Sequence, residues 1–302
     1  MARKNKFTDQ EREARRAEDR DRLAQAARAL LDSEGWKRWV RTRATNGLSR
    51  YSLNNQMLVA LQAPGATYVA GFKAWLGLRY CVRKGERALR ILAPVPLRKR
   101  TTQNDSADAD ADEEGGERPR VTFKATAVFD RSQVDPLPDC EPTPLEPPCE
   151  PLTGDSHAHL LEPLRAFCAD ELGFSVEVRE LSGSVGGWCD HAAREIVLDA
   201  RVAPNAQLRT LIHESAHALG VSYRDYPRAQ AEVIVDCTAY IVAASVGLDV
   251  GGESLPYVAG WGEEDSVEAV TRFAAVIDEL AGRLEGVLAG DRAPARATPA
   301  GA

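Results

Sequence analysis

The sequence predicts a protein of the α+β class, built from two α+β domains. In both halves of the chain some segments carry apolar residues at helical spacing, and others alternate at strand spacing. Prolines crowd residues 139–156, which show no periodic pattern, and this composition is typical of a linker. The chain of 302 residues is long enough for two domains of ordinary size. We therefore expect one domain over residues 36–138 and a second over residues 157–290.

In the first domain we expect a helix, a helical turn and a small sheet. Ser52 is a suitable N-cap for a helix of about ten residues that ends before Pro64. A helical turn follows near residues 72–76, and two strands then flank residues 83–86 as a hairpin. The strand pattern resumes over residues 121–130.

Three further segments flank or interrupt this domain organisation. Residues 1–35 form a charged N-terminal helix, and their alternating charges predict a solvated face. Residues 101–119 are acidic and poor in apolar side chains, which predicts a disordered insert. The Pro/Ala-rich residues 291–302 predict a disordered tail.

The second domain begins with a helix over residues 157–172. Strands are expected over residues 174–180 and 195–200, and helices over residues 228–247 and 266–288. Between the second strand and the first of these helices, residues 208–220 form a further amphipathic helix. Asn205 is its expected N-cap and Gly220 its expected C-terminal stop.

Composition excludes a membrane protein and indicates the compartment. Hydrophobic residues make up 44% of the chain and charged residues 27%, as in soluble globular proteins. No apolar run approaches the ~20 residues that span a bilayer, and the charged N-terminal stretch has no apolar core typical of a secretory signal. The six cysteines contain no CxxC pair, so we expect reduced thiols and a cytoplasmic protein.

The net charge of −7 hides a strong asymmetry along the chain. Residues 36–100 hold 14 Lys or Arg against the single acid Glu86, a balance of +13. Residues 1–35 hold 9 basic and 8 acidic side chains, so the remainder carries −7 − 13 − 1 = −21. The sequence therefore joins a basic segment to an acidic one.

The predicted helix over residues 208–220 carries the pattern HExxH, in which His213 and His217 lie four residues apart. Two imidazoles at this spacing share one helical face and can reach the same metal ion, while Glu214 can hold a water molecule beside it. The pattern followed by ExxxD on a second helix resembles the gluzincin metallopeptidases. That resemblance implies Glu232 as the third zinc ligand and Asp236 as the residue that orients a ligand histidine. The alternative is a pair of ordinary amphipathic helices with polar edges.

Aromatic residues are interleaved with the cations of the basic segment. Cations that follow phosphates and flat rings that stack on bases are what sequence-tolerant binding of single-stranded DNA requires. The alternative is that the rings belong to the core and the cations to a solvated surface. The candidate DNA-binding residues are Arg50, Tyr51, Asn55, Lys73, Trp75, Arg83 and Lys84.

Several motifs of the first domain occur in the order found in a known family. NGLSRYSLNNQMLVALQ, ATYVAGFKAW, VRKGERALRILAP and VFDRSQVDPLP resemble the N-terminal single-stranded-DNA-binding domain of ArdC-type antirestriction proteins, over residues 36–138. ArdC-type proteins place a metallopeptidase-like HExxH domain after that module, and the C-terminal part of this chain is also similar to the ImmA/IrrE metallopeptidases. The resemblance implies an ArdC-like first domain that is followed along the chain by a zincin-like second domain.

The predicted function is therefore single-stranded-DNA binding with protection against restriction, on a mobile element or phage-derived locus, by a protein that binds Zn²⁺ through His213, His217 and Glu232. One alternative is a regulatory zinc endopeptidase with a protein substrate, in which Glu214 is the general base. Another is a non-catalytic zinc-bound domain that mediates assembly. Tyr257 and His191 are further residues that can approach such a site.

Overall fold

The computed structural model describes residues 9–44, 48, 50–96, 121–145, 150–183, 185–250 and 267–290. Its α-helices are α1 (Asp9–Ala29), α2 (Ser33–Ala44), α3 (Leu53–Gln62), α4 (Phe72–Gly77), α5 (Leu161–Asp170), α6 (Pro204–Ala218), α7 (Arg228–Ser245) and α8 (Val267–Leu288). Its strands are β1 (Val69–Ala70), β2 (Tyr80–Val82), β3 (Leu89–Pro96), β4 (Val121–Asp130), β5 (Val134–Pro136), β6 (Ser175–Arg179), β7 (Gly187–Asp190) and β8 (Glu195–Asp199). Short 3₁₀ turns are η1 (Arg131–Gln133) and η2 (Ala158–Leu160). This mixture of helices and sheets confirms the predicted α+β class.

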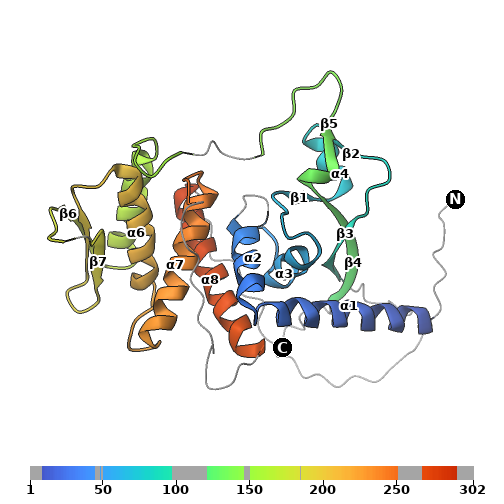
Figure 1. The fold of residues 1–302 in the computed structure, drawn as a ribbon, viewed down its shortest axis with the longest axis horizontal. Helices are drawn as coiled ribbons and strands as arrows, with labels where there is room; N and C mark the ends of the chain where they lie inside the picture. Colours follow the sequence, from blue (N-terminus) through green and yellow to red (C-terminus); the bar gives the residue numbers. More distant parts are fainter. Residues whose placement is uncertain are drawn as a thin grey trace, which may run out of the picture.

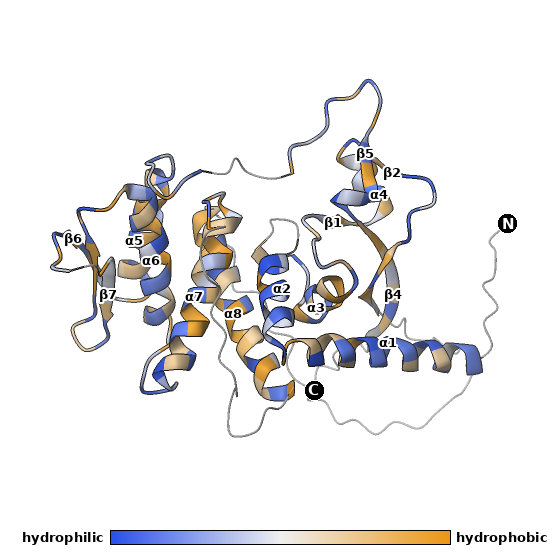
Figure 2. Ribbon diagram, viewed as in Figure 1, coloured by the Kyte–Doolittle hydropathy of each residue, from blue (hydrophilic) through white to orange (hydrophobic). Residues whose placement is uncertain are grey.

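In Figure 1, α7 and α8 lie in the middle of the molecule, with α5, α6 and the β6–β8 sheet on one side. On the other side, α1 and α2 pack against α3, which contacts β3 of the β3–β4 ribbon. Most of α1 is hydrophilic in Figure 2, in agreement with its predicted solvated face. The predicted insert at residues 101–119 and the tail at residues 291–302 lie outside the described residues. Within the part of the chain that is described, no helix is long and apolar enough to span a bilayer.

The N-terminal strands pair differently from the predicted hairpin around residues 83–86. Strand β3 pairs with β4 in antiparallel register from Leu89↔Val128 to Pro96↔Val121, and β2 pairs with β5. The strands on either side of this turn therefore belong to two different sheets. Both pairings join segments that are far apart in the sequence, so the local turn pattern could not reveal them.

The C-terminal sheet has the order β6-β8-β7, with β6 parallel and β7 antiparallel to β8. Helix α6 packs against β7 and β8. A Cβ atom at Gly187 would lie 2.6 Å from the Val197 carbonyl oxygen and 2.7 Å from the Thr210 side chain. Only glycine therefore permits this close approach of β7 to β8 and α6.

Helix α2 was not predicted, and it joins the two halves of the molecule. Its Trp36 and Trp39 are fully buried, with ring centroids 5.2 Å apart. They belong to the same hydrophobic core as Ile234, Ile241 and Ile277 of α7 and α8. The two segments that the sequence predicts as separate domains thus share one continuous core. The division of the chain at residues 139–156 stays a prediction.

A buried ion-pair network reinforces the contact between α2 and α8. Arg43, which is 1% exposed, places Nε 2.6 Å from Oδ1 of Asp278. Its two Nη atoms donate to the two carboxylate oxygens of Glu285 at 2.9 and 2.8 Å, and Gln56 also donates to Asp278 at 2.9 Å. Burial by itself lowers the pKa of Arg43, but the bonds from Glu285 and Asp278 more than offset this and raise it.

We expect Arg43→Ala to destabilise the whole protein by about 3–5 kcal/mol, because it leaves two carboxylates in a mostly buried site without their cation. The free energy of unfolding from urea denaturation, followed by tryptophan fluorescence, measures this. Arg41→Ala is the matched control, since Arg41 lies on the same helix but is exposed, and it should change the stability by less than about 0.5 kcal/mol. A loss below about 1 kcal/mol for Arg43→Ala would contradict the proposed role of the network.

Candidate metal centre

The helix that carries the HExxH pattern begins at Pro204, with Ala203 as its N-cap. Asn205 was predicted as the N-cap, but it lies inside the helix and does not cap it. Its buried side chain accepts from the His157 backbone N–H at 2.9 Å and donates to the Pro151 carbonyl at 2.8 Å. It thus attaches the end of the predicted linker to α6. Gly220 does follow the C-terminus, where its φ of +120° suits glycine.

Three donor side chains meet on α6. One ligand atom from each of His213, Glu214 and His217 lies within 4.8 Å of the others. Glu214 and His217 are buried, at 7% and 6% exposure, and His213 is partly buried. The three side chains therefore gather on α6 close enough to share one ion.

Each histidine has an oxygen partner at Nδ1. Nδ1 of His217 lies 2.7 Å from the Val221 carbonyl oxygen, and Nδ1 of His213 lies 3.0 Å from Oδ1 of Asp236. A carbonyl oxygen can only accept, so His217 must carry a proton on Nδ1. A neutral His217 then has its free lone pair on Nε2. The Asp236 oxygen lies at ion-pair distance from Nδ1 of His213, but the angle of this contact is not that of a hydrogen bond.

Helix α7 brings the two predicted carboxylates to this cluster. Oε2 of Glu232 lies 3.8 Å from Nε2 of His213, and Glu232 also accepts a hydrogen bond from the Tyr223 hydroxyl through Oε1. Asp236 lies one helical turn further on, where Arg209 of α6 places Nη2 3.6 Å from Oδ1. The two carboxylates face His213 from the same side of α7.

The electrostatics of the cluster follow from burial and from its acids. Burial raises the pKa of Glu214 to about 7. Burial also lowers the pKa of His217. For His213 burial acts in the same direction, but the bond to Asp236 and the charge of Glu214 more than offset it and raise the pKa. Asp236, although desolvated, has its pKa lowered by His213 and Arg209.

The donor set fits a divalent transition metal. Two imidazoles, of which His217 is held at Nδ1 by a carbonyl oxygen, and a carboxylate from a neighbouring helix are donors that zinc commonly takes. His213, His217 and Glu232 would hold the ion. Glu214 stands next to them as a buried carboxylate.

Three of the predicted DNA-binding residues have structural roles. Trp75 is fully buried and donates from Nε1 to the Phe129 carbonyl oxygen at 2.9 Å, so its ring cannot stack on a base. The side-chain amide of Asn55 bonds both the N–H and the C=O of Leu92, which ties α3 to β3. The Tyr51 hydroxyl donates to the Val69 carbonyl oxygen at 2.9 Å.

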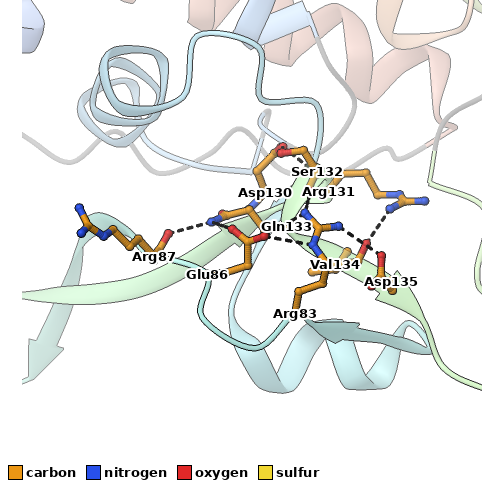
Figure 3. Close-up of polar contacts among 9 residues, drawn as sticks. All are labelled: Arg83, Glu86, Arg87, Asp130, Arg131, Ser132, Gln133, Val134 and Asp135. Carbon is orange, nitrogen blue, oxygen red and sulfur yellow. Dashed lines mark hydrogen bonds and ion pairs between the residues drawn. The ribbon is translucent and has the colours of Figure 1, made fainter.

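The four predicted cations are all exposed, but two of them already bind groups of the protein itself. The Arg50 guanidinium lies 4.8 Å from the centroid of the Tyr68 ring and donates to the Val69 carbonyl. Figure 3 shows Arg83 within a polar network, where it pairs with Glu86 at 2.9 Å and with Asp135 at 3.2 Å. Lys73 lies on α4 and Lys84 in the turn after β2. Part of the positive charge of the basic segment is therefore neutralised within the protein.

The predicted site residues left out two exposed rings. Phe72, on α4 beside Lys73, is 48% exposed. Tyr223, in the connection between α6 and α7, is 54% exposed and touches the metal cluster. Helical periodicity could not have separated Phe72 from buried Trp75, because residues three apart share one face of a helix. Nothing in the sequence marks Tyr223 either. His191 packs edge-on against Phe174, and Tyr257 lies outside the described residues.

The N-terminal part of the chain matches a known family. Residues 21–129 match the model described as the N-terminal domain of anti-restriction factor ArdC. The match begins within α1 and ends in β4, so it covers α2, which contacts α7, and α3, which contacts α8. This agrees with the resemblance predicted from the sequence motifs.

The similarity to individual proteins covers more of the chain than the family match does. The metal-free crystal structure of the antirestriction ArdC protein from plasmid R388 covers 90% of this chain and 99% of its own, with a TM-score of 0.51 and 16% identity, which shows a shared fold. Its Mn(II)-bound structure covers 80% and 88%, with a TM-score of 0.41 and 17% identity. An uncharacterised protein of Bacillus anthracis is 27% identical over 243 residues, 70% of this chain. The chain spans 41% of the length of that relative.

We expect the purified protein to bind about one zinc ion per chain, because the donor set suits one four-coordinate ion. His217→Ala should abolish this binding, since it removes one of the two imidazoles. Glu214→Gln should retain the metal if Glu214 acts on water rather than on the ion. Metal analysis of protein freed from excess zinc by gel filtration measures all three. A folded Glu214→Gln protein without zinc would instead make Glu214 a ligand.

Proposed function

We propose that this protein binds single-stranded DNA and acts against restriction, and that α6 and α7 form a zinc centre of the metallopeptidase type. The match of residues 21–129 to the N-terminal domain of an anti-restriction factor carries the first part. The second rests on the cluster of His213, Glu214 and His217, with Glu232 beside it. The similarity to ImmA/IrrE metallopeptidases and the location on a mobile element are part of this proposal.

Each residue of the proposed zinc centre has a separate chemical role. Bound Zn²⁺ would supply Lewis acidity, which polarises a peptide carbonyl and makes a water molecule more acidic. His213, His217 and Glu232 hold the ion, and Asp236 keeps His213 oriented. Glu214 accepts a proton from water on a carboxylate oxygen and passes it to the leaving amine. Burial of Glu214 keeps bulk water from competing for these proton transfers.

A second candidate function is a regulatory zinc endopeptidase whose substrate is a protein. The position of Glu214 favours it over a purely structural zinc site, because a structural site needs four ligands and no buried carboxylate beside them. Loss of proteolysis in Glu214→Gln, with the zinc retained, would support this function. An assembly role would leave that variant fully functional. A cytoplasmic location remains a prediction from the sequence.

The surface around α4 and the turn after β2 is the proposed DNA contact. Lys73 and Lys84 are exposed cations, and Phe72 offers an exposed ring beside Lys73. Arg83 faces Glu86 and Asp135 instead, so its charge is already used within the protein. Backbone phosphates and unpaired bases are the chemical groups that such a surface recognises.

The salt dependence of binding tests the phosphate contacts. Lys84→Ala should weaken binding to a single-stranded oligonucleotide and reduce the slope of log K against log salt by ~0.7, as expected for one lost phosphate contact. Arg83→Ala is the comparison and should change the slope less, because Glu86 and Asp135 neutralise Arg83. Fluorescence anisotropy titrations of the full chain at several salt concentrations provide the measurement. Equal slopes for Lys84→Ala and the wild type would place the phosphates elsewhere.

Substitution of Phe72 should affect DNA binding, whereas substitution of Trp75 should affect stability. Phe72→Ala should weaken DNA binding by ~1–3 kcal/mol and leave the fold intact, because an exposed ring can stack on a base. Trp75→Ala should destabilise the protein by about 3–5 kcal/mol, because it empties a buried site and leaves the Phe129 carbonyl unbonded. Anisotropy titration and urea denaturation of both variants separate the two effects. Unchanged binding by Phe72→Ala would remove Phe72 from the proposed contact.

A further inference from the structure

We infer that Tyr223 is a positioning residue of the metal centre: its hydroxyl donates to Oε1 of Glu232 and so holds the other carboxylate oxygen toward His213. This inference rests on the proposed zinc centre. It assigns a role to a tyrosine that lies outside both sequence patterns. Glu232 then has, like His217, a hydrogen-bond partner on the atom that does not face the proposed ion.

The contacts of Tyr223 place its hydroxyl at the centre. Its ring centroid lies 5.5 Å from that of His217, in an edge-on arrangement. The guanidinium carbon of Arg228 lies 5.4 Å from the same ring centroid, from the first turn of α7. The ring is thus held between a proposed ligand and the start of the helix that carries Glu232. Its hydroxyl is the hydrogen-bond donor, because the carboxylate of Glu232 accepts.

The connection between α6 and α7 fixes Tyr223 in the chain. The Ser222 hydroxyl donates to Oδ2 of Asp225 at 2.6 Å, and the Tyr226 backbone N–H donates to the Ser222 carbonyl at 3.0 Å. These bonds form a tight turn around Tyr223, although its side chain is 54% exposed. A pre-formed turn lowers the conformational entropy that is lost when the side chain is held against Glu232.

The single hydrogen bond matters because Glu232 is the most exposed of the proposed ligands, at 36% of its side chain against 16% for His213. An exposed glutamate has several rotamers, and only those that turn an oxygen toward the two imidazoles can bind the ion. The Tyr223 hydroxyl selects among them. Outer partners of this kind typically change metal affinity 10–100-fold.

The test is the Zn²⁺ dissociation constant of the full-length protein, measured by competition with a chromophoric chelator at fixed pH. Tyr223→Phe removes the hydroxyl and keeps the ring contacts, so we expect affinity to fall about tenfold. Tyr226→Phe is the matched control, because Tyr226 lies in the same turn and its ring packs toward Phe273 instead. It should bind zinc as the wild type does. Thermal unfolding of both apo-proteins checks that neither substitution disturbs the fold.

A double-mutant cycle separates positioning of Glu232 from any other effect of Tyr223. In a Glu232→Ala background, Tyr223→Phe should have no further effect on zinc affinity. An equal loss in both backgrounds would overturn the inference, because Tyr223 would then act on something other than Glu232. Unchanged affinity in the single variant would overturn it directly. A wild type that binds no zinc would instead refute the metal centre itself, and the positioning role with it.

Discussion

Arg43 imposes the constraint on which the arrangement of the two halves depends. A guanidinium cannot lose its charge at any ordinary pH, so a buried arginine must be surrounded by acceptors. Asp278 and Glu285 supply them from α8, more than 230 positions away in the sequence. The observed placement of α2 against α8 satisfies this requirement. The N-terminal segment is thus attached to the C-terminal helices by a buried ion-pair network as well as by apolar contacts.

Helix α7 connects this attachment to the candidate metal centre. One side of α7 packs in the core shared with α2, where Cys237 is fully buried against the Trp36 side chain. The adjacent residue, Asp236, contacts His213 on the other side. Consecutive residues of one helix therefore touch the N-terminal segment and the candidate ligand set. A rigid helix transmits small shifts along its length, so the two proposed activities share a common structural support.

How far the sequence could predict this structure depends on the range of the interactions involved. The HExxH helix, the helix of Glu232 and Asp236, and the closing helix follow from local periodicity, and the structure confirms them. The pairing of β2 with β5 and the burial of Arg43 depend on partners distant in the sequence, which no local pattern reveals. Charge counting failed for the same reason. A count of charges cannot show that Arg43 is buried against Asp278, or that exposed Arg83 is paired with Asp135.

The connection after the HExxH helix shows why a ligand pattern alone does not make a metal centre. The two histidines are placed by helical geometry, but a helix does not determine the rotation of their rings. Gly220, with φ of +120°, turns the chain at once, and this brings the Val221 carbonyl within 2.7 Å of Nδ1 of His217. The same turn delivers Tyr223 to Glu232. A side chain at Gly220 would strain that backbone conformation and move both partners together, so the turn is as much a part of the centre as the ligands are.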